Sequence, residues 1–276
     1  MFAQYDENKL EYLMNKFCNS FAIKNKLAEV PEYEKILQYI SAFIVPPDWS
    51  KTAFITKSQS MEVIPSYIIH RDNYLSQKDD FSRHLINEKI LHNYYLSLNK
   101  SYPKAVQFCN RLLKVILIAE LDSYIEGTTA EGLGIAHLDF KNHYNQLDFN
   151  ELIIHQITHM LLFIDDYIEP QVEASKKNLP IVTAAKHKRG GNSFPLYILF
   201  HSFCVGVEIL DYRLRSETLN TPVNYHPGTS IAINRCKEGF SILHENMKLF
   251  TLNGRKLLKQ YGDFLDELMN RIENAA

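Results

Sequence analysis

The segment from Leu147 to Asp166 constrains the fold more than any other part of the sequence, because it predicts a helix that is apolar on every side. Asp148 and Glu151 form a capping-box pattern, so we expect the helix to begin there, and Pro170 limits how far it can run. A helix of this kind must be enclosed by other elements. The rest of the chain is therefore expected to form layers around it.

Two histidines, His155 and His159, lie inside this segment, four residues apart, which places both rings on one face of the helix. Two imidazoles at this spacing can reach one metal ion, as in the H-E-x-x-H motif of zinc peptidases. Here Gln156 occupies the position of the motif's catalytic Glu, and an amide cannot take a proton from a metal-bound water. Hydrolysis by that route is disfavoured, while chemistry that needs only three ligands and open positions is not. The alternative is a pair of structural histidines that are hydrogen-bonded in the core.

Three residues are candidates for a third metal ligand. His201 belongs to the apolar stripe of a helix predicted over 196–213, and Glu208 lies two turns further along the same face. Asp166 follows the histidine pair on its own helix, at the carboxyl end, where the helix dipole disfavours a carboxylate, so we expect it to have a partner. His137, in a predicted strand, is expected to be a hydrogen-bonded histidine rather than a ligand.

The composition excludes several classes of partner. A formal net charge of -2 and a pI near 6.6 give no electrostatic footprint for nucleic acid or an anionic membrane. No apolar run is long enough to span a membrane, and the first residues lack the features of a signal peptide, so we expect a cytoplasmic protein. The cysteines are far apart and form no C-x-x-C pair, which predicts reduced core thiols at Cys18, Cys109, Cys204 and Cys236.

The remaining sequence predicts a mainly α (α+β) fold. A buried strand at 115–119 and a partner at 132–138, joined by a Gly/Thr-rich turn, lead into the histidine helix, so we expect a small antiparallel sheet beside a buried, zincin-like H-x-x-x-H helix. A weaker strand is predicted at 61–70, and 45–60 is expected to be a loop. Without repeats or linkers, the chain is predicted to be a single domain (1–276), with a helical N-terminal half (1–102) that is a candidate substrate-binding region and a metal-site half (103–276). The other predicted helices cover 7–24, 33–43, 79–98, 104–113, 230–250 and 255–274.

Between about 103 and 215, the sequence resembles the HExxH-type peptide β-hydroxylases, which are iron- and 2-oxoglutarate-dependent enzymes of RiPP biosynthesis that modify ribosomally made peptides. The resemblance depends on the order of four motifs: Gly132-Leu133-Gly134-Ile135-Ala136-His137-Leu138, His155-Gln156-Ile157-Thr158-His159, a basic loop that leads to Pro195-Leu196, and Leu199-Phe200-His201. Two positions differ from the family: Gln156 replaces the motif's Glu, and Ser202 replaces a Gly that often follows the third His.

The resemblance implies a non-haem Fe(II)/2-oxoglutarate-dependent dioxygenase that hydroxylates a C–H position of a peptide. By that resemblance, His155, His159 and His201 would hold Fe(II). Arg189, in the basic loop, would contact 2-oxoglutarate, and Arg213 is a second candidate for the cosubstrate's distal carboxylate.

Two other functions remain open from the sequence. The first is a zincin-like metallohydrolase with Asp166 or Glu208 as third ligand, and the second is a helical binding protein with structural histidines or an inert metal. Gln156 and Asp166 are the candidate catalytic positions beside the metal.

Overall fold

The computed structural model describes residues 6–41, 48–56, 59, 88–120, 128–184 and 192–275. The described chain is mainly helical and includes a small antiparallel sheet as well as a parallel one, which confirms the predicted fold class. Its helices are α1 (Glu7–Lys24), α2 (Tyr33–Ser41), α5 (Glu88–Ser101), α6 (Pro103–Leu112), α7 (Gln146–Ile168), α8 (Leu196–Arg215), α9 (Thr229–Glu245) and α10 (Leu252–Ala275). Its strands are β1 (Ala53–Thr56), β2 (Val115–Ala119), β3 (Ile135–Asp139), β4 (Pro180–Val182) and β5 (Ser193–Pro195). Short 3-10 turns lie at Ala130–Gly132, Ala174–Lys176 and Met247–Leu249.

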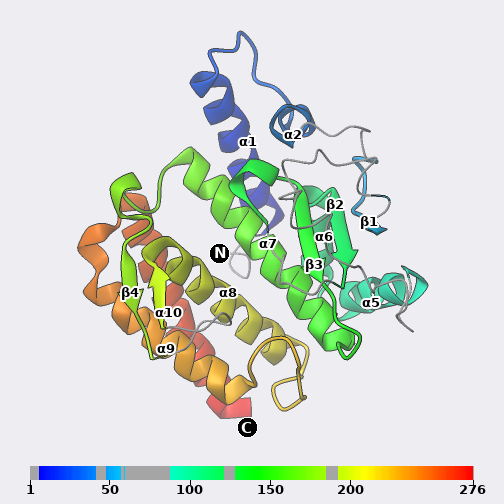
Figure 1. Cartoon of the computed structure of the whole chain (residues 1–276), viewed down its shortest axis with the longest axis vertical. Coiled ribbons are helices and arrows are strands. Elements are labelled where there is room, and N and C mark those ends of the chain that lie inside the picture. Colours follow the sequence, from blue (N-terminus) through cyan, green and yellow to red (C-terminus); the bar gives the residue numbers. More distant parts are fainter. Residues whose placement is uncertain are drawn as a thin grey trace.

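The central element is α7, which carries the histidine pair and is enclosed as its apolar sequence requires. Helices α1, α5, α6 and α8 pack against it, and Figure 1 shows α7 crossing the middle of the molecule between the parallel sheet and the C-terminal helices. The helix begins at Gln146, slightly before the predicted Asp148, because Asn145 is the N-cap and forms the capping box with Asp148. It ends at Ile168, within the limit set by Pro170.

The parallel sheet differs from the expected strand arrangement. Strands β2 and β3 pair as predicted, but in parallel, with Val115 opposite Ile135. The segment 120–134 between them is long enough for the crossover that parallel pairing requires, whereas a tight turn would have made them antiparallel. Strand β1 adds to the other edge of β2, inside the region predicted as a loop. The antiparallel sheet is formed instead by β4 and β5, which precede α8.

Most predicted helices agree with the structure, including α1, α6, α8 and α10 within a few residues. Of the helix predicted over 79–98, the described part is α5, and 79–87 lies outside the described residues, as does the strand predicted at 61–70. The helix predicted over 230–250 ends at Glu245, and a 3-10 turn follows.

One hydrophobic cluster runs through the described residues from Leu10 on α1 to Ile272 on α10. All four cysteines are buried and reduced, as predicted. In the described part of the chain, every helix is too short or too polar to cross a membrane. The buried core therefore holds α7 and α8 in fixed positions, and these two helices carry the histidines.

Candidate metal centre

The histidine pair on α7 converges as the sequence predicts. Nε2 of His155 and Nε2 of His159 are 3.0 Å apart, and both side chains are partly exposed. With metal–nitrogen bonds of about 2.0–2.1 Å, two nitrogens at this separation would subtend an angle of about 90–100° at one ion. That angle is close to the angle between adjacent ligands in octahedral coordination. The helix therefore presents two ligands in a geometry that fits one metal ion.

His201, the predicted third ligand, joins the pair from α8 but at a different atom. Its Nδ1 lies 3.3 Å from Nδ1 of His159, the nitrogen on the opposite side of that ring from the one that faces His155. Burial lowers the pKa of His159 to about 4 and that of His201 well below its ordinary value, so both rings are neutral at neutral pH. The three rings are in contact but do not surround one point. Within the described ranges, no group of three or more His, Cys, Asp or Glu side chains is arranged to hold a metal.

A fourth histidine, His226, completes the cluster and was not predicted from sequence. Its Nε2 is 3.1 Å from Nδ1 of His155. The ring belongs to the loop between α8 and α9, and Asp148 holds that loop by accepting hydrogen bonds from the backbone N–H groups of Asn224 and Tyr225, at 2.7 and 2.9 Å. The capping carboxylate of α7 therefore also places His226 against the pair.

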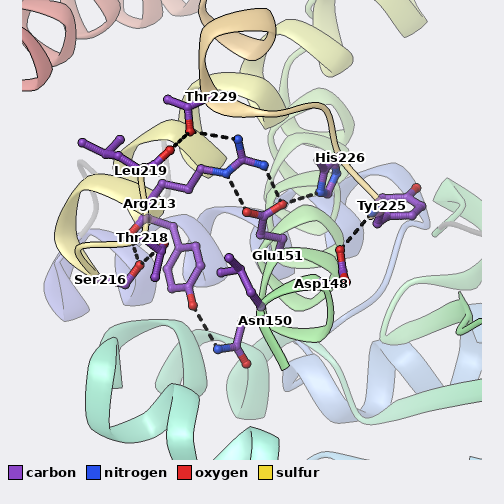
Figure 2. A network of polar contacts seen from close by, with 12 residues as sticks. Asp148, Asn150, Glu151, Arg213, Ser216, Thr218, Leu219, Tyr225, His226 and Thr229 are labelled. Atoms are coloured by element: carbon purple, nitrogen blue, oxygen red, sulfur yellow. Dashed lines mark hydrogen bonds and ion pairs between the residues drawn. The ribbon is translucent and has the colours of Figure 1, made fainter. Parts of the chain in front are cut away.

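Glu151 anchors the other side of His226 (Figure 2). His226 Nδ1 donates to Glu151 Oε2 at 2.9 Å, while Arg213 Nε and Nη2 bind the two carboxylate oxygens at 2.6 and 3.0 Å. Burial raises the pKa of Glu151, but the hydrogen bonds and charges of His226 and Arg213 outweigh it, so the net effect lowers this pKa. Arg213 also donates to Pro227 and Thr229. This arginine is thus buried in an ion pair within the protein, which is not the cosubstrate contact that the sequence indicated.

The far end of the chain of rings is Gln171, in the segment after α7. His201 Nε2 lies 3.2 Å from Gln171 Oε1. The amide nitrogen of Gln171 donates to the carbonyl of Leu162 at 3.0 Å and to Asp165 at 2.8 Å.

Asp165 also lines a cavity of about 440 Å³ between α1, α7 and α10, together with Lys9, Lys256 and several apolar side chains.

The four rings and their two end groups form one continuous series: Gln171, His201, His159, His155, His226 and Glu151. The series contains five contacts, and its two end groups, the amide oxygen of Gln171 and the carboxylate of Glu151, both accept hydrogen bonds.

The carboxylates considered as third ligands have other partners. Asp166 accepts from the backbone N–H of Gln171 at 2.8 Å and from Lys177 at 2.6 Å, which is the offset expected for a carboxylate at this end of a helix. Glu208 is buried and accepts from Tyr261 at 2.7 Å. His137 lies on β3, and its ring is half-buried.

Gln156, at the motif position next to His155, is fully buried. Neither its amide oxygen nor its amide nitrogen has a hydrogen-bond partner among the described residues. Arg189, the other predicted cosubstrate contact, lies outside the described residues.

No protein-family model matches the sequence, and no curated protein matches it significantly. A proposal about function must therefore be based on the residues of the site and on their geometry.

Proposed function

We propose that this chain is a metal-dependent oxygenase in which His155 and His159 bind Fe(II), 2-oxoglutarate is the cosubstrate, and a C–H bond of a peptide is hydroxylated. The observation that carries the proposal is the pair of Nε2 atoms of His155 and His159, which lie 3.0 Å apart on one face of a buried helix. Iron with 2-oxoglutarate and O₂ would supply the oxidation, in which one oxygen atom enters the substrate and the other enters succinate as CO₂ leaves.

The surroundings of the pair favour oxidation over hydrolysis. A hydrolase needs a general base beside the metal, but Gln156 cannot accept a proton at neutral pH. Glu151 is held by Arg213 and His226, and Asp166 is held by Lys177. Oxygenation of a C–H bond needs no such base, which fits the residues that the site contains.

The protein's own residues contribute position and enclosure. Both ligands stand on one buried helix, so their separation is fixed by the helix backbone rather than by a loop. His201 and His226 contact the outer Nδ1 atoms of the pair and hold the ring orientations. By the family resemblance, Arg189 is the proposed contact for the distal carboxylate of 2-oxoglutarate. Arg213, the other candidate, is bound to Glu151.

The peptide substrate and the cytoplasmic location belong to the same proposal. The peptide follows from the family resemblance of the segment 103–215. The proposed location is supported by the four cysteines, which are buried and form no disulfide with one another.

A second candidate function is a helical binding protein with structural histidines. The observation that favours it is that each of the four rings has a contact at both of its nitrogens without any metal. Under this alternative, the cluster would only join α7, α8 and the loop that carries His226.

An anaerobic titration with Fe(II) and then 2-oxoglutarate separates the two functions. We expect a weak visible charge-transfer band once 2-oxoglutarate chelates the bound iron, and we expect no band for His155→Ala. His244→Gln removes a histidine from α9, so this matched control should show the band of the unaltered protein. Iron that does not bind, or that binds without a band, would refute the oxygenase and leave the structural alternative. Binding of Zn(II) with peptide hydrolysis would instead support a metallohydrolase.

A further inference from the structure

The cavity of about 440 Å³ lies outside the histidine cluster, between α1, the carboxyl end of α7 and the first turns of α10. Its volume falls within the range of pockets that bind small molecules, about 300–1,000 Å³. Among its lining residues, Tyr12 and Leu252 are 63% and 80% exposed, whereas Leu13 and Leu257 are buried. The cavity therefore combines an apolar floor with an open entrance that a ligand can reach.

Two walls of the cavity are positively charged. On α1, Lys9, Tyr12, Leu13 and Lys16 recur at helical spacing, so they share one face of that helix, and all four line the cavity. Lys256 faces the same cavity from the second turn of α10, close to the helix end where the dipole is positive. These walls thus present lysines next to apolar side chains.

The wall formed by α7 has the opposite charge. Asp165 and Glu169 lie one turn apart at the carboxyl end of this helix, where the helix dipole is negative. Asp165 Oδ2 accepts hydrogen bonds from the amides of Gln171 and Asn253, at 2.8 and 3.0 Å. In the described part of the chain, neither carboxylate forms an ion pair, although three lysines line the same cavity. Charges of both signs therefore face the cavity from different walls.

A ligand that complements these walls carries a cation at one end, an anion at the other and an apolar body between them. A free amino acid has both charged groups on one carbon atom, which is too close together for opposite walls. An extended tripeptide is about 10 Å long, so its two ends can reach across a cavity of this volume.

We propose that this cavity binds a short apolar peptide with free ends. Its ammonium group contacts Asp165 and Glu169, its carboxylate contacts the lysines of α1 and α10, and its side chains cover Leu13 and Leu257. Binding at this cavity needs no metal and is separate from the proposed oxygenase chemistry.

Three matched probes test the two charges separately: the tripeptide Leu-Phe-Leu with both ends free, the same peptide with an acetylated amino group, and the same peptide with an amidated carboxylate. Calorimetric titration of the metal-free full chain measures each Kd. We expect saturable binding of the free peptide and an affinity about 3–10-fold lower for each blocked form, because each block removes the contacts of one charged end.

Either of two results would overturn the proposal. One is a blocked form that binds as tightly as the free peptide, since the wall of opposite charge would then take no part. The other is a free peptide that shows no saturable binding at millimolar concentration. The Fe(II) titration is independent of both results, so failure of the peptide site and failure of the proposed oxygenase are distinguishable.

Substitutions assign each end of the peptide to its wall. Glu169→Gln should weaken binding of the free peptide about 2–5-fold and leave the acetylated form unaffected, because that probe has no ammonium group. Lys256→Gln should weaken the free peptide to a similar extent and leave the amidated form unaffected. Both residues are exposed, so neither change should impair folding.

The matched controls are Glu173→Gln and Lys259→Gln, which change exposed residues of the same two types that do not line the cavity. Both controls should bind all three probes like the unaltered protein. A free peptide that binds Glu169→Gln and Lys256→Gln as tightly as it binds the controls would lie elsewhere on the protein, and the assignment of this cavity would be wrong.

Discussion

Gln156 is a polar residue at a fully buried helical position where an apolar side chain would be expected. Its side chain is fully buried in the most apolar helix of the protein, and neither polar atom has a hydrogen-bond partner among the described residues. An amide buried in this way lowers stability by about 1–3 kcal/mol relative to one that is hydrogen-bonded. Substitution of Gln156 should therefore change the stability of the protein in a predictable direction.

We expect Gln156→Leu to raise the free energy of unfolding by about 1–2 kcal/mol, because leucine fills a similar volume and needs no hydrogen bond. Urea denaturation would measure the change. Gln156→Glu is the matched comparison: a buried carboxylate should lower stability and should make it depend on pH. A loss of stability in Gln156→Leu would show that the amide does have a partner in the folded protein.

At the scale of elements, the ion pair between Glu151 and Arg213 joins α7 to α8 and to the loop that carries His226. Both side chains are fully buried, so neither charge can be hydrated if its partner is removed. We expect Glu151→Met and Arg213→Met each to lower the free energy of unfolding by about 3–5 kcal/mol, and the double variant to recover most of that loss.

Denaturation of the two single variants and the double variant forms a double-mutant cycle. Additive losses would contradict the buried pair, because independent residues show no coupling.

A second contact between elements lies where α10 begins. Gly254 is packed so closely against the segment after α7 that a Cβ atom there would lie 1.9 Å from the carbonyl oxygen of Gln171. Gly254→Ala must therefore displace backbone, and we expect it to lower the free energy of unfolding by about 1–3 kcal/mol or more. Gly228→Ala, where no atom lies within 4 Å of the added Cβ, is the control and should keep the stability of the unaltered protein. Equal behaviour of the two variants would contradict the packing at α10.

The elements and the metal pair could be predicted from sequence to different extents. Helix α7 and the convergence of His155 and His159 follow from local periodicity, because both depend on residues one turn apart. Glu151 also matched a local pattern, the capping box, but its partner is Arg213, far along the chain. His226 had no local signal at all, since its loop reaches the pair only after α8 has folded back along α7.

The whole molecule adds constraints that local patterns do not contain. The segments 115–119 and 132–138 were expected to pair across a turn, but strand direction depends on the path of the chain between them, and the structure makes β2 and β3 parallel. Strand β1 was missed because it is short and only half-buried, so it lacks the apolar run that identified β2. By contrast, the burial of the cysteines was predictable, because it required only apolar helical surroundings.

Those buried thiols predict how the stability of the whole molecule depends on pH. Burial raises the pKa of Cys109 to about 11 and that of Cys236 to about 12, and it raises the pKa of Cys204 well above its ordinary value. Between about pH 9 and 10, the thiols of the unfolded chain lose protons that the folded protein keeps. The free energy of unfolding is therefore highest below this pH range with respect to these thiols, and it declines as the pH rises through the range. Each thiol should lower the free energy of unfolding by up to about 1.4 kcal/mol per pH unit.

Urea denaturation under reducing conditions at pH 8, 9 and 10 would measure this slope. Cys236→Ala removes one ionisable thiol, so its stability should decline less steeply than that of the unaltered protein, even if its stability at pH 8 is lower. At pH 8 the native thiols should also resist Ellman's reagent until urea unfolds the chain, because the reagent needs an accessible thiolate. A stability that does not change from pH 8 to 10, together with rapid thiol reaction in the native state, would mean that the helices around these cysteines open far more readily than their burial implies.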